Sequence, residues 1–85
     1  MALTEEILNA EIKKWAQRLD DALARTHAKG QKGVEYLTNI KAYQSDSLHF
    51  LERKDPVRAF EALLWAWAYL QISKDLELVT ETPIV

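Results

Sequence analysis

Hydrophobic residues recur at spacings of three and four along three stretches of the chain, which is typical of helices with one buried face. The recurring positions of the first stretch are Leu8, Ile12, Trp15, Leu19, Ala22 and Thr26. Those of the second stretch are Tyr36, Ile40, Tyr43, Ser47 and Phe50. The pattern predicts an all-α domain with helices over residues 5–29, 34–53 and 56–74 and an extended tail over residues 75–85.

The third stretch is hydrophobic on nearly every side. It opens with Asp55, a good helix N-cap, and Pro56, which is tolerated at the first helical position. One stripe, predicted to be buried, consists of Ala59, Leu63, Ala66 and Leu70. A helix that is apolar nearly all round is normally buried nearly all round. We therefore expect this helix at the centre of a three-helix bundle.

Two other helices cover only two sides of the central helix, and one apolar side is left over. The candidate partner-binding residues on this side are Leu64, Trp65, Tyr69 and Ile72. An apolar area on the order of 400 Å² would gain about 10 kcal/mol when buried, whereas association costs roughly 4–15 kcal/mol. The surface therefore permits a homodimer or another protein partner without requiring either.

The connections between the predicted elements set the topology. The link from Arg53 to Pro56 is so short that the second and third helices must form an antiparallel hairpin. The tail is rich in β-branched residues, and Pro83 excludes helix near its end. A lone strand has nothing to pair with in a helical domain. We expect the tail to be extended, either covering the free side of the third helix or reaching a neighbouring chain.

Helix-end signals define the first helix. Thr4 is the predicted cap, with a hydrophobic staple between Leu3 and Leu8. The helix is predicted to end at Lys29, because glycine, here Gly30, is the usual residue just past a helix end.

Four basic residues gather around this predicted helix end. They are Arg25, His27, Lys29 and Lys32. Cations in the last turn complement the helix dipole, which is the ordinary interpretation. Such a cluster can also bind phosphate or nucleic acid, although no aromatic side chains are interleaved with it. Nucleic-acid binding through residues 25–32 is therefore an alternative function rather than the leading one.

Length and charge narrow the class of protein. The 85 residues form a single domain, 1–85, and the net charge of −2 is too small to imply a partner. There is no cysteine and no signal-peptide pattern at the start. The longest apolar run, Ala62–Leu70, is far shorter than the ~20 residues of a membrane span. A cytoplasmic protein without membrane contact and without a cofactor is expected.

The polar residues of the second helix are the candidates for chemistry. Asp46 flanks the apolar stripe beside Tyr43, where an unpaired buried carboxylate is costly. We therefore expect it to bond a tyrosine hydroxyl or a tryptophan indole, or to reach water. Asp46 and His49 are three residues apart and could share one metal ion, but a di-metal bundle needs such a pair on two helices. No nucleophile elbow and no phosphate-binding glycine loop occurs. No catalytic or metal-ligand set is assigned.

The second and third helices carry a combined spacing of aromatic, aspartate and alanine residues. It reads Tyr43-x-x-Asp46-x-x-x-Phe50-Leu51, then Asp55-x-Val57-x-Ala59-Phe60-Glu61-Ala62-x-x-Trp65-Ala66-x-x-Tyr69-Leu70. Over residues 36–70 the chain resembles the archaeal domain-of-unknown-function family 357, a family of short helical proteins. The resemblance implies a helical bundle and an archaeal source, and it brings no activity with it.

Three hypotheses for the function follow. The leading one is a non-catalytic module for self-association or protein binding, which uses the free side of the third helix and the tail. The second is a small-molecule or metal-dependent helical enzyme centred on Asp46, with Tyr43 and His49. The third is nucleic-acid binding through the basic residues.

Overall fold

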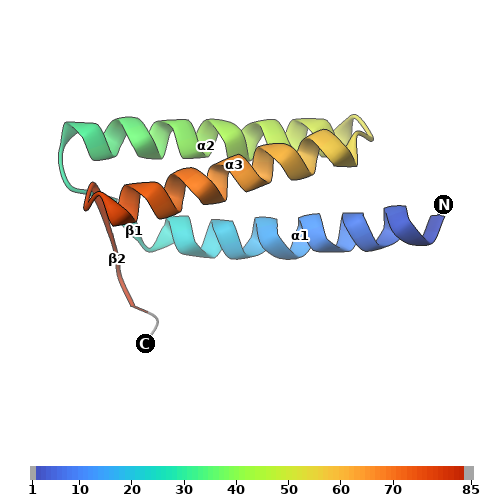
Figure 1. Cartoon of the computed structure of the whole chain (residues 1–85), viewed down its shortest axis with the longest axis horizontal. Helices are drawn as coiled ribbons and strands as arrows, with labels where there is room; N and C mark the ends of the chain where they lie inside the picture. The colour runs from blue at the N-terminus through green and yellow to red at the C-terminus, as the bar shows by residue number, and fades with distance from the viewer. Residues whose placement is uncertain (1, 84–85) are drawn as a thin grey trace.

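The computed structural model describes residues 2–83 of the chain, with side chains from Thr4 onward. It consists of three helices and two short strands (Figure 1). The elements are α1 (Ala2–Ala24), β1 (Thr26–Ala28), α2 (Gln31–Glu52), α3 (Pro56–Asp75) and β2 (Val79–Glu81). The prediction of an all-α, three-helix architecture is confirmed. None of the described helices has an apolar stretch long enough to cross a membrane.

The third helix lies between the other two (Figure 1). α1 and α3 run in the same direction, and α2 runs in the opposite direction, so that α2 and α3 form the predicted antiparallel hairpin. Both α1 and α2 pack mainly on α3 rather than on each other. The largest fully buried hydrophobic side chains come from all three helices and are Ile12, Leu19, Ile40, Leu63 and Leu70.

Small side chains hold α2 close to α3. Ala59, Ala62 and Ala66 of α3 are all buried, and these small side chains allow close packing of α3 beside the larger residues of the core. Ser47 of α2 is buried as well, and its hydroxyl donates a hydrogen bond of 2.7 Å to the carbonyl of Ala59. The bond satisfies a polar group that would otherwise be costly to bury.

The start of α3 is the predicted one. The carboxylate of Asp55 accepts a hydrogen bond of 3.2 Å from the backbone N–H of Arg58, and Pro56 is the first helical residue. Lys54 just before it has a positive φ of 61°, which reverses the chain between α2 and α3. The predicted end of this helix, residue 74, lies one residue from the observed one.

The predicted end of the first helix was wrong. α1 ends at Ala24, and Thr26–Ala28 form β1 instead of a last helical turn. The buried hydroxyl of Thr26 donates a bond of 2.7 Å to the carbonyl of Ala22 and so closes the helix. His27 and Lys29 therefore lie beyond the helix and do not occupy its last turn, whereas Arg25 directly follows the helix end. In the strand conformation the backbone of β1 pairs with the tail instead of continuing the helix.

The tail has a strand to pair with, contrary to the prediction. β2 pairs with β1 in antiparallel register, with Thr26 opposite Glu81 and Ala28 opposite Val79. The N–H of Thr82 continues the contact by donating to the carbonyl of Arg25 at 2.7 Å. The described tail residues thus do not cover the free side of α3. Residues 84 and 85 lie outside the described part of the chain.

Two further helix starts differ from the predicted ones. α2 begins at Gln31 rather than at residue 34, because Gly30, with φ 117°, turns the chain directly into the helix. α1 begins at Ala2, so Thr4 lies inside the helix and is not its cap. The predicted staple partner Leu3 has a side chain that lies outside the described ones.

Candidate functional site

The side of α3 that faces away from the core is exposed and hydrophobic. We call the residues Leu64, Trp65, Ala68 and Ile72 the outer face. Leu64 is 50% exposed, Trp65 57% and Ile72 44%. A helix at a protein surface ordinarily presents charged residues on its solvent side. The outer face instead presents an uncovered apolar stripe.

Aromatic stacking fixes Trp65 from one side. Its ring stacks on Tyr43 of α2, with centroids 6.4 Å apart and an interplanar angle of 22°. Tyr43 also stacks on Tyr69, at 5.6 Å and 17°. Tyr69 is half-buried and in turn meets Tyr36 in an edge contact. Tyr69 was predicted as a partner-binding residue. Its ring instead packs behind the outer face, against the tyrosines of α2.

A groove between α1 and α3 continues the outer face. We call it the indole groove, because Trp15 of α1 and Trp67 of α3 meet in it at right angles, with centroids 5.8 Å apart. The indole N–H of Trp67 donates to the carbonyl of Trp15 at 3.3 Å. The groove has a volume of about 430 Å³. Its lining is almost wholly apolar and consists of Trp15, Phe60, Leu63, Leu64, Trp67, Ala68 and Gln71.

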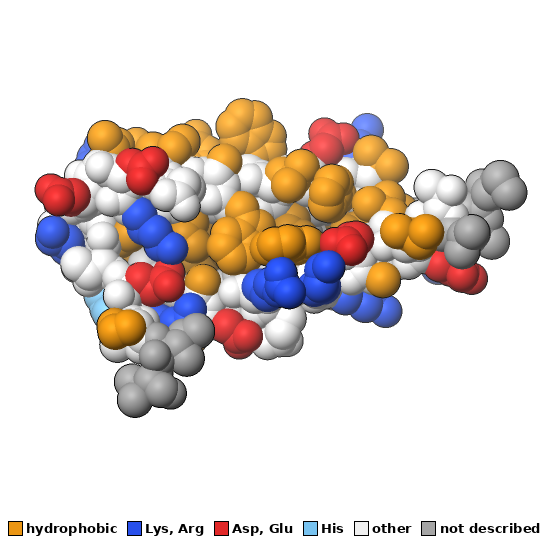
Figure 2. All heavy atoms as spheres, turned by 60° about the horizontal axis from the view of Figure 1, so that its bottom comes forward, with side chains coloured by type: hydrophobic (Ala, Val, Ile, Leu, Met, Phe, Trp, Pro, Cys, Tyr) orange, Lys and Arg blue, Asp and Glu red, His pale blue; other side chains and the backbone are white. Residues whose placement is uncertain are grey.

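Leu64 and Ala68 belong to both features, so that the outer face and the indole groove form one continuous hydrophobic surface. Figure 2 shows a broad band of hydrophobic side chains on this side of the molecule, bordered by Lys and Arg residues. The sequence pattern placed Trp15 on the buried seam of the first helix, but its side chain is 38% exposed. The hydrophobic periodicity therefore did not predict the indole groove.

Charges of both signs border this surface. The guanidinium of Arg18 lies 4.5 Å from the centre of the Trp15 ring, a cation–π arrangement. Lys14 pairs with Glu11 at 3.1 Å. The Lys14 ammonium, together with the indole N–H of Trp15, holds the pKa of the Glu11 carboxyl below its ordinary value. Glu61 lies on the α3 side, in the hollow formed by Leu64, Trp65 and Ala68.

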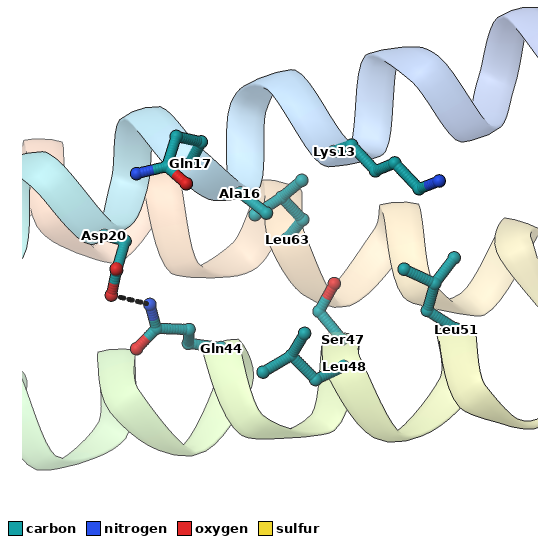
Figure 3. A pocket seen from close by; sticks show the side chains of 9 residues that line it. All are labelled: Lys13, Ala16, Gln17, Asp20, Gln44, Ser47, Leu48, Leu51 and Leu63. Atoms are coloured by element: carbon teal, nitrogen blue, oxygen red, sulfur yellow. Dashed lines mark hydrogen bonds between the residues drawn. The ribbon is translucent and has the colours of Figure 1, made fainter.

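A second open groove separates α1 from α2 (Figure 3). Its volume is about 370 Å³, and Leu63 of α3 forms part of its lining. Gln44 bridges the two helices by donating to the carboxylate of Asp20 at 3.2 Å. The lining residues are Lys13, Ala16, Gln17, Asp20, Gln44, Ser47, Leu48, Leu51 and Leu63. Its two charged side chains, Lys13 and Asp20, both come from α1 and have opposite signs.

The polar candidates of α2 do not converge. Tyr43 is part of the aromatic stack, whereas Asp46 and His49 are exposed on the helix surface. Among the described residues Asp46 makes no hydrogen bond to a tyrosine hydroxyl or an indole, so its carboxylate is solvated. The His49 ring contacts Phe50 edge-on and lies 3.5 Å from the Arg53 guanidinium. No group of three or more His, Asp or Glu in the described part of the chain is arranged to hold a metal ion.

The four basic candidates are spread over the turn after α1, β1, the following loop and the first turn of α2. Arg25 pairs with Glu81 at 3.3 Å, and Lys74 pairs with the same carboxylate at 2.7 Å. The pKa of Glu81 is lowered by the Lys74 ammonium first and by the Arg25 guanidinium second. His27 Nε2 lies 3.1 Å from the hydroxyl of Thr82. Two more members of the predicted cluster, Lys29 and Lys32, are exposed.

These features define a small helical protein whose most distinctive surface is hydrophobic. In the comparison with known proteins, the family model described as a protein of unknown function, DUF357, matches residues 14–79. The chain therefore belongs to the DUF357 family, as the spacing of its aromatic, aspartate and alanine residues predicted. A crystal structure of a DUF357 protein from Archaeoglobus fulgidus is similar, with 42% sequence identity and a TM-score of 0.82. The match covers 93% of this chain and 99% of that one. No curated protein matches the chain.

Proposed function

We propose that this DUF357 protein is a non-catalytic protein–protein interaction module that binds another chain through the outer face and the indole groove. The observation that supports the proposal is the continuous exposure of Leu64, Trp65 and Ile72 along α3. Isolated exposed apolar residues are normal, but contiguous exposed patches mark interaction sites.

The arrangement of Trp65 suits a binding hot spot. Tryptophan is enriched among the residues that dominate binding energy at interfaces. The stack on Tyr43 restricts the Trp65 ring before any partner arrives, so that less rotamer entropy is lost on binding. Trp15 and Trp67 add a second aromatic pair beside it.

The two alternative functions have weaker support. An enzyme centred on Asp46 would need other titratable groups nearby, but its carboxylate and His49 are both exposed to solvent on one helix. Nucleic-acid binding through the basic residues would use Arg25, which the Glu81 carboxylate already pairs with. Protein binding is the function that the described side chains favour.

Site-specific photo-crosslinking tests the proposal. A benzophenone amino acid is introduced at position 65 of the full chain, and separately at position 41, where Lys41 is exposed on α2. Irradiation in cells that produce the protein is expected to give discrete protein adducts from position 65 and few from position 41. Equal adduct formation at both positions, or none at position 65, would contradict the proposed interaction surface.

A further inference from the structure

Two charged side chains border the hydrophobic surface without an ion-pair partner among the described residues. Arg18 stacks on Trp15 at the edge of the indole groove, and Glu61 lies beside Trp65 on the outer face. A partner surface of a single charge sign would meet repulsion at one of these two positions. A second copy of this chain carries both signs itself, and a two-fold interface must be self-complementary in this way.

The positions of the two charges along the helices determine the geometry. α1 and α3 run in the same direction (Figure 1), and Trp15 lies at the level of Trp67. Arg18, three residues further along α1, therefore lies near the level of Leu70 on α3. Glu61 precedes Leu70 by nine residues, which corresponds to about 14 Å along the helix axis. The midpoint between the two levels falls close to Trp65.

We propose that the bound chain is a second copy, related by a two-fold axis that crosses α3 near Trp65. The outer faces then pack against each other with the two α3 helices antiparallel. This arrangement brings Arg18 of each copy to the level of Glu61 of the other, twice per dimer. The inference rests on the proposed function and names its partner.

The size of the surface sets the strength of this dimer. The apolar area expected from the sequence, on the order of 400 Å² per copy, corresponds to about 800 Å² buried in total, below the ~1,200 Å² typical of stable complexes. The polar border around Arg18 and Glu61 adds to the buried area. The dimer is therefore expected to dissociate on dilution, and its two ion pairs are expected to weaken as salt is added.

Light scattering across a concentration series tests the dimer with the full chain. The unmodified protein is expected to shift from monomer to dimer as its concentration rises. Trp65→Glu is expected to remain monomeric, because a carboxylate would be buried against the partner's apolar outer face. Circular dichroism confirms that each variant is folded. Lys41→Glu, which places a glutamate at an exposed position of α2 away from the outer face, is the control and is expected to dimerise normally.

Charge reversal tests the register. Arg18→Glu and Glu61→Arg are each expected to raise the dimer dissociation constant several-fold at low salt, because like charges then face each other. An equimolar mixture of the two variants is expected to dimerise better than either variant alone, since opposite charges meet again at both positions. A mixture that dimerises no better than the separate variants would refute the proposed register. An unmodified protein that stays monomeric at all concentrations would refute the proposal that the partner is a second copy.

The crosslinking experiment separates this inference from the proposed function. Discrete adducts at position 65 with other proteins, from a chain that stays monomeric in solution, would refute the second copy and leave the interaction surface supported. Absence of both adducts and dimers would refute the two together.

Discussion

The backbone carbonyl of Leu78 lies against Gly33, in the place that a side-chain β-carbon at position 33 would occupy. The same carbonyl accepts a hydrogen bond of 2.8 Å from the N–H of Lys29. Gly33 is buried although it belongs to the first turn of a helix. The contact docks the chain just before β2 onto the start of α2, and only glycine leaves room for it.

Replacing this glycine is therefore expected to destabilise the fold. In a helix, alanine is ordinarily favoured over glycine by about 1 kcal/mol. For Gly33→Ala we expect the opposite sign, a loss of about 1–3 kcal/mol of unfolding free energy, because the new methyl group must displace backbone atoms. Urea denaturation followed by circular dichroism measures this loss of unfolding free energy. Asn39→Ala changes an exposed position in the same helix and is the control. A Gly33→Ala protein as stable as the parent would contradict the close approach of Leu78 to Gly33.

This contact illustrates what the sequence could and could not predict. Hydrophobic periodicity identified the three helices, and Asp55 with Pro56 located the start of α3 to the residue. The strands could not be predicted, because three residues show no periodicity. Their pairing joins Thr26 to Glu81, two residues that are separated by about two-thirds of the chain length. The tail was consequently predicted to lack the partner that it has.

The candidate surface was predicted in part. An excess of apolar residues on α3 predicted that the other two helices would not cover Leu64, Trp65 and Ile72, and left open whether the tail does. The indole groove could not be predicted in the same way, because periodicity defines which face of a helix is apolar but not how two helices tilt against each other. Trp15 belongs to the apolar seam of α1, yet it is 38% exposed where its ring meets Trp67. The positions of Arg18 and Glu61 relative to each other depend on that same contact.

The ion cluster at Glu81 is expected to make the strand pair sensitive to pH. Lys74 and Arg25 lower the pKa of this carboxyl from its ordinary value near 4.5. A carboxyl with a lowered pKa in the folded state stabilises the fold above the unfolded-state pKa. That stability is lost as the pH falls from the unfolded-state pKa through the lowered one.

Glu81→Gln removes this contribution. At pH 7 we expect a loss of about 1 kcal/mol in unfolding free energy, the upper end for partly exposed ion pairs. The difference from the parent protein is expected to shrink below pH 4.5 and to vanish once the parent carboxyl is protonated. Urea denaturation of both proteins at a series of pH values measures this difference in unfolding free energy. A difference that does not change with pH would show that Lys74 and Arg25 contribute through packing alone.

The alanine packing of the helical hairpin predicts a strong effect of side-chain size. Ala66 is fully buried in α3, where it faces the rest of the core. Ala66→Leu adds volume to a closely packed position and is expected to destabilise the fold by about 1–3 kcal/mol. Ala42→Leu, at an exposed position of α2, is expected to change the unfolding free energy by less than about 0.5 kcal/mol. Thermal unfolding of the two variants checks the contrast, and equal midpoints would argue against close packing.

The start of α3 allows a cap to be distinguished from an ion pair. The Asp55 carboxylate accepts a hydrogen bond from the backbone N–H of Arg58 and also lies 3.5 Å from the Arg58 guanidinium. The Arg58 side chain is 68% exposed. Exposed ion pairs contribute little, whereas loss of an N-cap costs about 1 kcal/mol. Asp55→Ala is therefore expected to lower the unfolding free energy by about 1 kcal/mol. Asp55→Asn is expected to be nearly neutral, because asparagine caps a helix as well as aspartate does. Equal losses in the two variants, measured by urea denaturation, would assign the stabilisation to the charge and not to the cap.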